Sequence, residues 1–317
     1  MVVNGMLGHF TGGRRNLQGG SVVSGTLVVG IDGTESSRAA LRWALTRAAI
    51  TGAELKLIHV IDDEWTTISA RMIKDLGDDS QRLLESEAEY VRSLAPNVTV
   101  YTESTRGEPM QVLISASRDA GMVVVGTHKT GFINGKIFGS RSLQLAASAY
   151  APVAIIPQGL PRDGRGIVAG VDDSIAGRQA IRFAAREAGR TGETLTLVRA
   201  FTIPATSTIS DDARSELIQY SEERASTALA DAVTLATLTA PDLDLKTRTV
   251  RRPIAEVLVD AAATATLLVI GSSRQQEATA MVGSVSHDVL INLTGPAVVV
   301  HAGDAREGAE HGHAGSM

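Results

Sequence analysis

The sequence contains no cysteine, no excess of positive charge and no long apolar run. The absence of cysteine among 317 residues excludes disulfide bonds, a thiol nucleophile and zinc sites with cysteine ligands. It is also compatible with a reducing compartment, and we expect a cytoplasmic protein. The formal net charge of −5 gives no basic footprint for nucleic acid. Because no stretch approaches about 18 uninterrupted apolar residues, we expect no membrane span.

Both ends of the chain look unlike the rest. The N-terminal segment MVVNGMLGHFTGGRRNLQGGS places its arginines after a mildly apolar part, which is not the order of a signal peptide. We expect residues 1–25 to form a disordered leader, and the glycine-rich residues 303–317 to form a disordered tail.

An internal repeat organises the rest of the chain. Two pairs of segments match at an offset of 140 residues: TGAELKLIHVI at 51–61 with TGETLTLVRAF at 191–201, and VVGIDGTESSRAALRWA at 28–44 with VAGVDDSIAGRQAIRFA at 168–184. The segment between the copies, QGLPRDGRG, has the proline, glycine and charge of a linker. The sequence therefore predicts two copies of one domain, at residues 26–158 and 166–302.

Short apolar runs alternate with helical patterns in each copy. In the first copy the runs are TLVVGID, LKLIHVI, VTVYTES, MVVVGT and PVAIIP, and the middle ones lack polar alternation, as in parallel strands covered on both faces. Helical spacing of apolar residues marks 36–50 and 80–95, Pro109 suits the first turn of a third helix, and Ser140 suits the N-cap of a fourth. We predict an α/β fold of two tandem, doubly wound, Rossmann-like parallel sheets with five strands each. Such sheets bind ligands beyond the carboxyl ends of their strands.

A glycine-rich stretch, VVVGTHKTGFINGKIFGSRS, follows one of these strand patterns at 123–142. The stretch ends where a helix begins, and the backbone N–H groups at a helix start favour binding of an anion, most of all phosphate. The alternative interpretation is a flexible connection between strand and helix. The stretch is not a P-loop, because Ile137 follows Lys136. It is not a dinucleotide fingerprint either, because His128 stands where the second glycine would be.

Each copy resembles a universal stress protein domain. An aspartate closes the first strand (VGID, AGVD), the third helix of the first copy starts as GEPMQVL, and a Gly-to-Gly-Ser loop precedes a last strand that opens with proline. The resemblance covers about residues 25–301. It implies the adenine nucleotide alpha hydrolase-like form of the predicted fold, and an adenine nucleotide, ATP with or without Mg²⁺, as the ligand.

The ATP-binding branch of that family carries the loop G-x-x-G-x(9)-G-[ST]. Gly126 and the Gly139-Ser140 pair reproduce its outer spacing, but Lys129 replaces the second glycine. In the second copy Arg274 stands at that place and the loop is one residue shorter, while Arg252 replaces Gly107 of the first copy. We therefore predict that the first copy binds nucleotide better, with Lys129 and Arg141 beside the phosphates.

The resemblance also implies the residues of the site. In the first copy these are Gly30, Ile31, Asp32, Val60, Gly126, Thr127, Lys129, Gly139, Ser140, Arg141 and Ser142, and in the second copy Asp172, Gly271, Gly283, Ser284 and Val285. By the same resemblance the Val60 backbone would contact the adenine, and Asp32 would accept hydrogen bonds from the ribose or orient an ion bound to the phosphates. Each could instead be an ordinary residue at a strand end. We expect no catalytic residue and no protein metal site.

Three classes of function remain open. The first is a nucleotide-sensing regulatory protein of the stress response with little or no catalysis, and the second is an interaction module without nucleotide. The third is an ATP-using enzyme, which is disfavoured because neither IDGTESS nor VDDSIAG offers the S-G-G-x-D-S loop of ATP pyrophosphatases.

The last strands of the two copies, PVAIIP and PAVVVH, are apolar. In this family they end each sheet, and an exposed apolar edge invites pairing. We expect the two copies to form an intramolecular pseudo-dimer, and two chains to form a homodimer as a further possibility.

Overall fold

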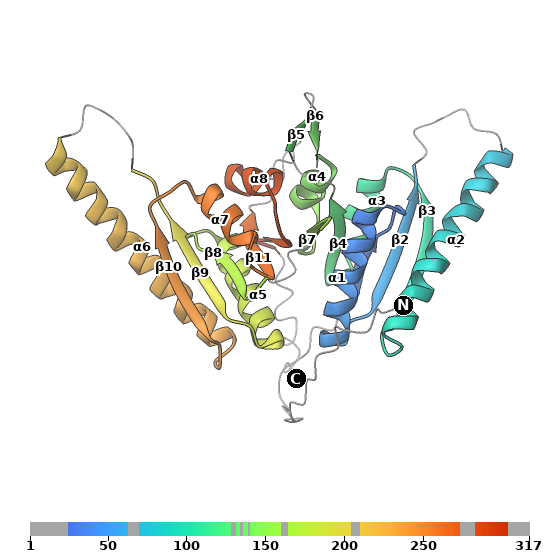
Figure 1. Ribbon diagram of the computed structural model, residues 1–317, viewed down its shortest axis with the longest axis horizontal. Helices are drawn as coiled ribbons and strands as arrows, with labels where there is room; N and C mark the ends of the chain where they lie inside the picture. The colour runs from blue at the N-terminus through green and yellow to red at the C-terminus, as the bar shows by residue number, and fades with distance from the viewer. Residues whose placement is uncertain are drawn as a thin grey trace, which may run out of the picture.

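The computed structural model describes residues 25–62, 70–127, 131–133, 136–138, 140–159, 164–203, 210–272 and 283–303. Almost all of the expected leader and tail lies outside the described residues, and so do Lys129, Gly139 and Arg274. The described part forms two similar α/β repeats that spread like two wings from a shared centre (Figure 1).

Each repeat alternates strands and helices. The first contains β1 (Leu27–Gly30), α1 (Glu35–Thr51), β2 (Leu55–Ile61), α2 (Ala70–Leu94), β3 (Val100–Arg106), α3 (Pro109–Ala116), β4 (Met122–Thr127), β5 (Gly131–Ile133), β6 (Lys136–Phe138), α4 (Ser140–Ser148) and β7 (Val153–Pro157). The second contains β8 (Ile167–Gly170), α5 (Ile175–Thr191), β9 (Leu195–Ala200), α6 (Asp211–Thr239), β10 (Leu245–Val250), α7 (Ile254–Ala262), β11 (Leu267–Ser272), α8 (Ser284–Ile291) and β12 (Ala297–His301).

The five main strands of each repeat form half of one ten-stranded sheet, in the order β10-β9-β8-β11-β12-β7-β4-β1-β2-β3. All neighbours are parallel except at the centre, where β12 pairs with β7 antiparallel and Val299 lies opposite Val153. The predicted α/β fold of two tandem, doubly wound repeats is confirmed. The two strands at the centre, β7 and β12, are buried along their whole length.

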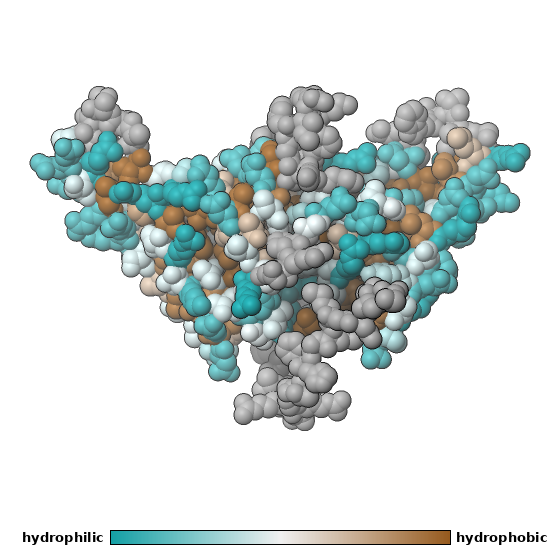
Figure 2. Space-filling model, in the orientation of Figure 1, coloured by the Kyte–Doolittle hydropathy of each residue, from teal (hydrophilic) through white to brown (hydrophobic). Residues whose placement is uncertain are grey.

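Two apolar layers cover the faces of the sheet, and each layer extends through both repeats. One lies under α1, α2, α5 and α6, with Leu41 and Ile181 among its buried residues. The other lies under α3, α4, α7 and α8, with Leu145 and Val289. Hydrophilic residues cover much of the outer ends of the molecule, over α2 and α6 (Figure 2), so each of these helices buries only one stripe.

Local sequence signals start and stop the helices. Thr34 and Ser174 cap α1 and α5 with their side chains, and Gly52 and Gly192 end the same helices at φ 72° and 69°. These positive φ values are readily adopted by glycine. Ser140 is the first residue of α4 rather than its N-cap. None of the described helices is both long and apolar enough to cross a membrane.

Two elements differ from the sequence prediction. The helix α2 begins at Ala70, about ten residues before the predicted start, and the additional part contains Met72, Ile73 and Leu76 at helical spacing, which the prediction left out. Inside the glycine-rich stretch, β5 and β6 pair antiparallel, with Phe132 opposite Ile137. The stretch therefore contains a short hairpin and is not a plain loop.

Candidate functional site

The order of strands reverses at the first strand of each repeat. The strand β1 lies between β2 and β4, and β8 lies between β9 and β11. In open α/β sheets, ligands bind in the crevice outside the carboxyl ends of the strands at such a reversal. The predicted site residues that are described all lie in or directly after β1, β2, β4, β8 and β11, or at the starts of α4 and α8.

A cavity of about 380 Å³ opens at this edge in the second repeat. Its lining comes from the ends of β8, β9 and β11, from α7 and from the start of α8: Gly170, Val171, Asp172, Ser174, Arg199, Ala200, Ile254, Leu258, Ile270, Gly271, Ser272, Gly283, Ser284, Val285 and Ser286. The volume falls within the range of roughly 300–1,000 Å³ that small-molecule sites occupy. All five second-repeat residues predicted from the sequence line this cavity.

The aspartate after the first strand is part of a tight turn in both repeats. Asp32 Oδ1 accepts hydrogen bonds from Thr34 N at 2.9 Å and from Thr34 Oγ1 at 2.6 Å. Asp172 Oδ1 accepts the same two bonds from Ser174, at 2.9 and 2.6 Å. Because Thr34 and Ser174 also cap the following helices, each aspartate is held by the start of its helix.

Gly126 and Gly271 lie where these helix starts cross the ends of β4 and β11. A Cβ atom on Gly126 would stand 2.1 Å from the carbonyl oxygen of Ser36. A Cβ atom on Gly271 would stand 2.6 Å from the carbonyl carbon of Ala176. The obstacle is backbone in both cases and cannot move aside. The close approach of backbone therefore explains why glycine occupies both positions, without reference to a ligand.

The start of α8 lines the cavity, and the backbone N–H groups of its first three residues have no hydrogen-bond partner among the described residues. Its N-cap residue, Gly283, makes no side-chain capping bond, and a Cβ atom there would meet nothing within 4 Å. Ser286 Oγ donates to Gly271 O at 3.1 Å and ties the first turn of α8 to the end of β11. An uncapped helix start with open space before it favours an anion.

Ser272 adds a buried hydroxyl to the same cavity. The residue is 3% exposed, and its Oγ atom makes no hydrogen bond within the described part of the chain. A buried hydroxyl without a partner costs roughly 1–3 kcal/mol. A ligand that accepts a hydrogen bond from Ser272 would remove that cost.

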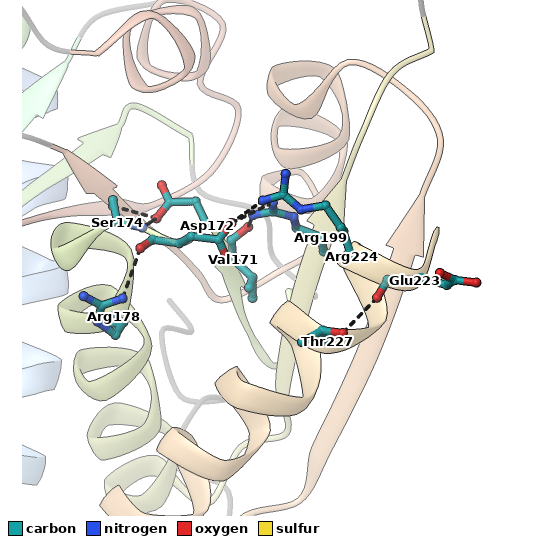
Figure 3. A network of polar contacts seen from close by, with 9 residues as sticks. Val171, Asp172, Ser174, Arg178, Arg199, Glu223, Arg224 and Thr227 are labelled. Carbon is teal, nitrogen blue, oxygen red and sulfur yellow. Dashed lines mark hydrogen bonds and ion pairs between the residues drawn. The ribbon is translucent and has the colours of Figure 1, made fainter. Parts of the chain in front are cut away.

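Arg199, near the end of β9, is a cavity residue that sequence reasoning missed. Its Nη1 atom donates to Val171 O at 2.9 Å, and its Nη2 atom lies 3.3 Å from Asp173 Oδ2 (Figure 3). In the first repeat, His59 occupies the equivalent place, with Nδ1 at 2.7 Å from Ile31 O. The match of TGAELKLIHVI to TGETLTLVRAF already set these two residues in register, and that match could have identified Arg199.

In the first repeat, part of the predicted site is described. Gly30, Ile31 and Asp32 follow one another at the end of β1, Val60 lies half-buried in β2, and Thr127 ends β4 and is 4% exposed.

On the α4 side of the first-repeat site, the structure describes the residues from Ser140, where the helix begins. Arg141 and Ser142 lie in the first turn of α4. Arg141 is exposed, with Nη2 at 3.9 Å from Asp62 Oδ2. Lys129 and Gly139 lie outside the described residues, so their predicted contacts stay predictions.

Because Arg252 replaces Gly107 of the first repeat, the sequence predicts that its bulk hinders nucleotide binding in the second repeat. Its side chain instead pairs with two carboxylates of α7, with Nη1 at 2.9 Å from Asp260 Oδ2 and Nη2 at 3.2 Å from Glu256 Oε2. These acidic partners raise the pKa of the Arg252 guanidinium, led by the hydrogen bond to Asp260. Arg252 is not among the residues that line the cavity.

Comparisons of the sequence and of the structure with known proteins point to the same family. A family model described as the universal stress protein family matches residues 24–157 and again residues 165–301. A universal stress protein of Mycolicibacterium smegmatis is 29% identical over 290 residues, which span 86% of this chain and 96% of the relative. A universal stress protein of Mycobacterium tuberculosis H37Rv is 28% identical over 306 residues, spanning 86% of this chain and 95% of the relative. A crystal structure of a universal stress protein from Archaeoglobus fulgidus has the same fold, with a TM-score of 0.65 and 17% identity, over 89% of this chain and 100% of that one.

Proposed function

Because the chain belongs to the universal stress protein family, we propose that it is a nucleotide-binding regulatory protein of the stress response that performs little or no catalysis. The ligand is an adenine nucleotide such as ATP, with or without Mg²⁺, and the protein acts in the cytoplasm. One site lies in each repeat, and ATP prefers the first. In this proposal the two repeats act as an intramolecular pseudo-dimer, and a homodimer of chains is compatible with it.

The observation that carries this proposal is the cavity at the carboxyl ends of β8, β9 and β11. Its chemistry suits the parts of a nucleotide. The uncapped start of α8 and the Ser272 hydroxyl suit phosphate oxygens. The apolar side chains of Ile254, Leu258 and Val285 suit a base.

The lining of the cavity supports binding more than chemistry. Among the described lining residues Asp172 has the one carboxylate, and Oδ1 of that carboxylate already accepts two hydrogen bonds from Ser174. A general base has to be within hydrogen-bond reach of the proton it removes and must be able to take it up. Among the described residues no group of three or more acidic, histidine or cysteine side chains could hold a metal ion. Any Mg²⁺ would therefore be held mainly by the phosphates of the ligand.

Mass spectrometry of protein purified under native conditions, followed by calorimetry with ATP and ADP, tests the proposal. We expect an adenine nucleotide to be released from the purified protein and two binding events of unequal affinity per chain. Gly283→Glu places a carboxylate at the start of α8, so it should remove the weaker event. Gly283→Ala is the matched control, because a Cβ atom there meets nothing within 4 Å. Finding no bound nucleotide, and no binding of ATP or ADP, would overturn the proposal.

A further inference from the structure

Arg199 brings a second positive group to the cavity, apart from the start of α8. Its side chain is 20% exposed and comes from β9, whereas α8 is tied to the end of β11 by the bond from Ser286 to Gly271. In the sheet, β8 lies between β9 and β11. The strands β9 and β11 therefore lie two strand spacings apart, roughly 10 Å, and the Arg199 side chain reaches from β9 to the carbonyl oxygen of Val171, just after β8.

Arg199 and Arg224 share one carboxylate beside the cavity. Arg199 and Arg224 both approach Asp173 Oδ2, at 3.3 and 3.6 Å, and Arg178 Nη1 donates to the Asp173 carbonyl oxygen at 3.0 Å. Figure 3 shows Arg199 and Arg224 reaching from β9 and α6 toward the loop after β8. One carboxylate is thus shared by two guanidinium groups, so it balances the charge of only one of them.

Glu223, the next acidic residue on α6, does not offset this charge. Its Oε1 atom accepts a hydrogen bond from Gln219 Nε2 at 3.0 Å on the exposed side of the helix. The guanidinium of Arg199 has five N–H donors, and the contacts to Val171 and Asp173 use two of them. It therefore keeps donors for a ligand.

The first repeat lacks this arrangement. At the offset of 140 residues, His59 stands in place of Arg199 and Gly33 in place of Asp173. The two sites therefore differ in charged residues on one side, which is formed by β9 in the second repeat and by the equivalent strand β2 in the first. A difference of this kind in charged residues is suited to select between ligands of different charge distribution.

We infer that the cavity of the second repeat takes a nucleotide with phosphate on both sides of its ribose, one phosphate at the start of α8 and the other at Arg199. This inference rests on the proposed function and adds the class of ligand for the second site. ATP carries all its phosphates on the 5′ side and leaves Arg199 without an anion. A guanidinium in a partly buried site binds a phosphate through charge-assisted, often bidentate hydrogen bonds.

Calorimetry on the full chain tests the inference with two probes, ADP and adenosine 3′,5′-bisphosphate. Both contain the same base, the same sugar and two phosphates, so they differ in where the second phosphate lies. At the second site we expect the bisphosphate to bind about tenfold or more tightly than ADP. Arg199→His, which installs the residue of the first repeat, should abolish that preference.

Two further variants separate a ligand contact from a structural effect. Arg199→Lys keeps the charge and should keep part of the preference, even where Arg199→His lowers the thermal midpoint. Arg178→His is the matched control, because Arg178 contacts the same loop but does not line the cavity. It should leave the preference unchanged.

Each outcome has a definite meaning. If ADP binds and the bisphosphate binds no better, the inference is wrong and the proposed function stands. If the preference survives Arg199→His, or is lost equally in Arg178→His, the second phosphate does not bind at Arg199 and the inference is wrong. If neither probe binds, the proposed function itself fails.

Discussion

Arg47 of α1 and Glu187 of α5 form an ion pair buried between the two repeats, with each side chain 8% exposed. The two residues are equivalent positions of the repeat, 140 residues apart. The Arg47 guanidinium also lies over the rings of Trp43 and Phe183, at 5.8 and 5.4 Å, and these aromatic residues are equivalent positions too. A symmetric pair of domains would bring like residues together here. This chain instead places opposite charges at its centre.

The electrostatics of Arg47 follow from that burial. Burial lowers the pKa of Arg47 to about 10, and the Arg190 cation acts in the same direction. A pKa of about 10 still leaves the Arg47 guanidinium protonated at neutral pH.

Reversing one charge of this pair should destabilise the protein strongly. Arg47→Glu would bury two carboxylates together, and Glu187→Arg would bury two guanidinium groups. Each should lower the free energy of unfolding by about 3–5 kcal/mol, the cost of a buried charge left without its partner. Urea denaturation followed by circular dichroism measures the loss.

The double exchange, Arg47→Glu with Glu187→Arg, is the control for this prediction. It restores opposite charges and should recover much of the lost stability, although the contacts of the guanidinium with the two aromatic rings change. Additive losses in the double variant would contradict the idea that the two charges stabilise each other.

Substituting Gly126 or Gly271 should disturb the fold itself. Gly126→Ala would place a Cβ atom 2.1 Å from the carbonyl oxygen of Ser36, and Gly271→Ala would meet the α5 backbone at 2.6 Å. We expect each to cost at least the roughly 1–3 kcal/mol typical of overpacking, because backbone cannot rotate away as a side chain can. Gly283→Ala should be near neutral in the same thermal melts, and a neutral Gly126→Ala would show that the helix start moves freely.

Much of the fold could be predicted from the sequence, because apolar runs mark individual strands and the internal repeat marks the two domains. The main strands coincide with the apolar runs that the sequence shows, and the turns at Asp32 and Asp172 have the same hydrogen bonds in both repeats. The hairpin of β5 and β6 was missed, because the glycine-rich stretch favours an anion site or a flexible connection and its two strands have only three residues each.

The missed parts of the site depend on residues far apart in the chain. Arg199 meets Asp173 and Arg224 only because β8, β9 and α6 pack together. Arg47 finds its partner in Glu187, at a separation that no local pattern reveals. Sequence reasoning placed the cavity through the strand ends and glycines, but it could not find side chains that tertiary packing brings to it.

The relative strength of the two proposed nucleotide sites can be tested by substituting their aspartates. Asp32 and Asp172 make matching turns, with hydrogen bonds of 2.9 and 2.6 Å to the next capping residue. Asp32→Ala and Asp172→Ala should therefore cost similar stability, about 1 kcal/mol each through the weakened helix cap. Any difference in ATP affinity then reports the ligand and not the turn. We expect Asp32→Ala to weaken the tighter ATP event in calorimetry and Asp172→Ala to leave it unchanged. A larger loss of the tighter event in Asp172→Ala would show that ATP prefers the second repeat, where the described cavity lies.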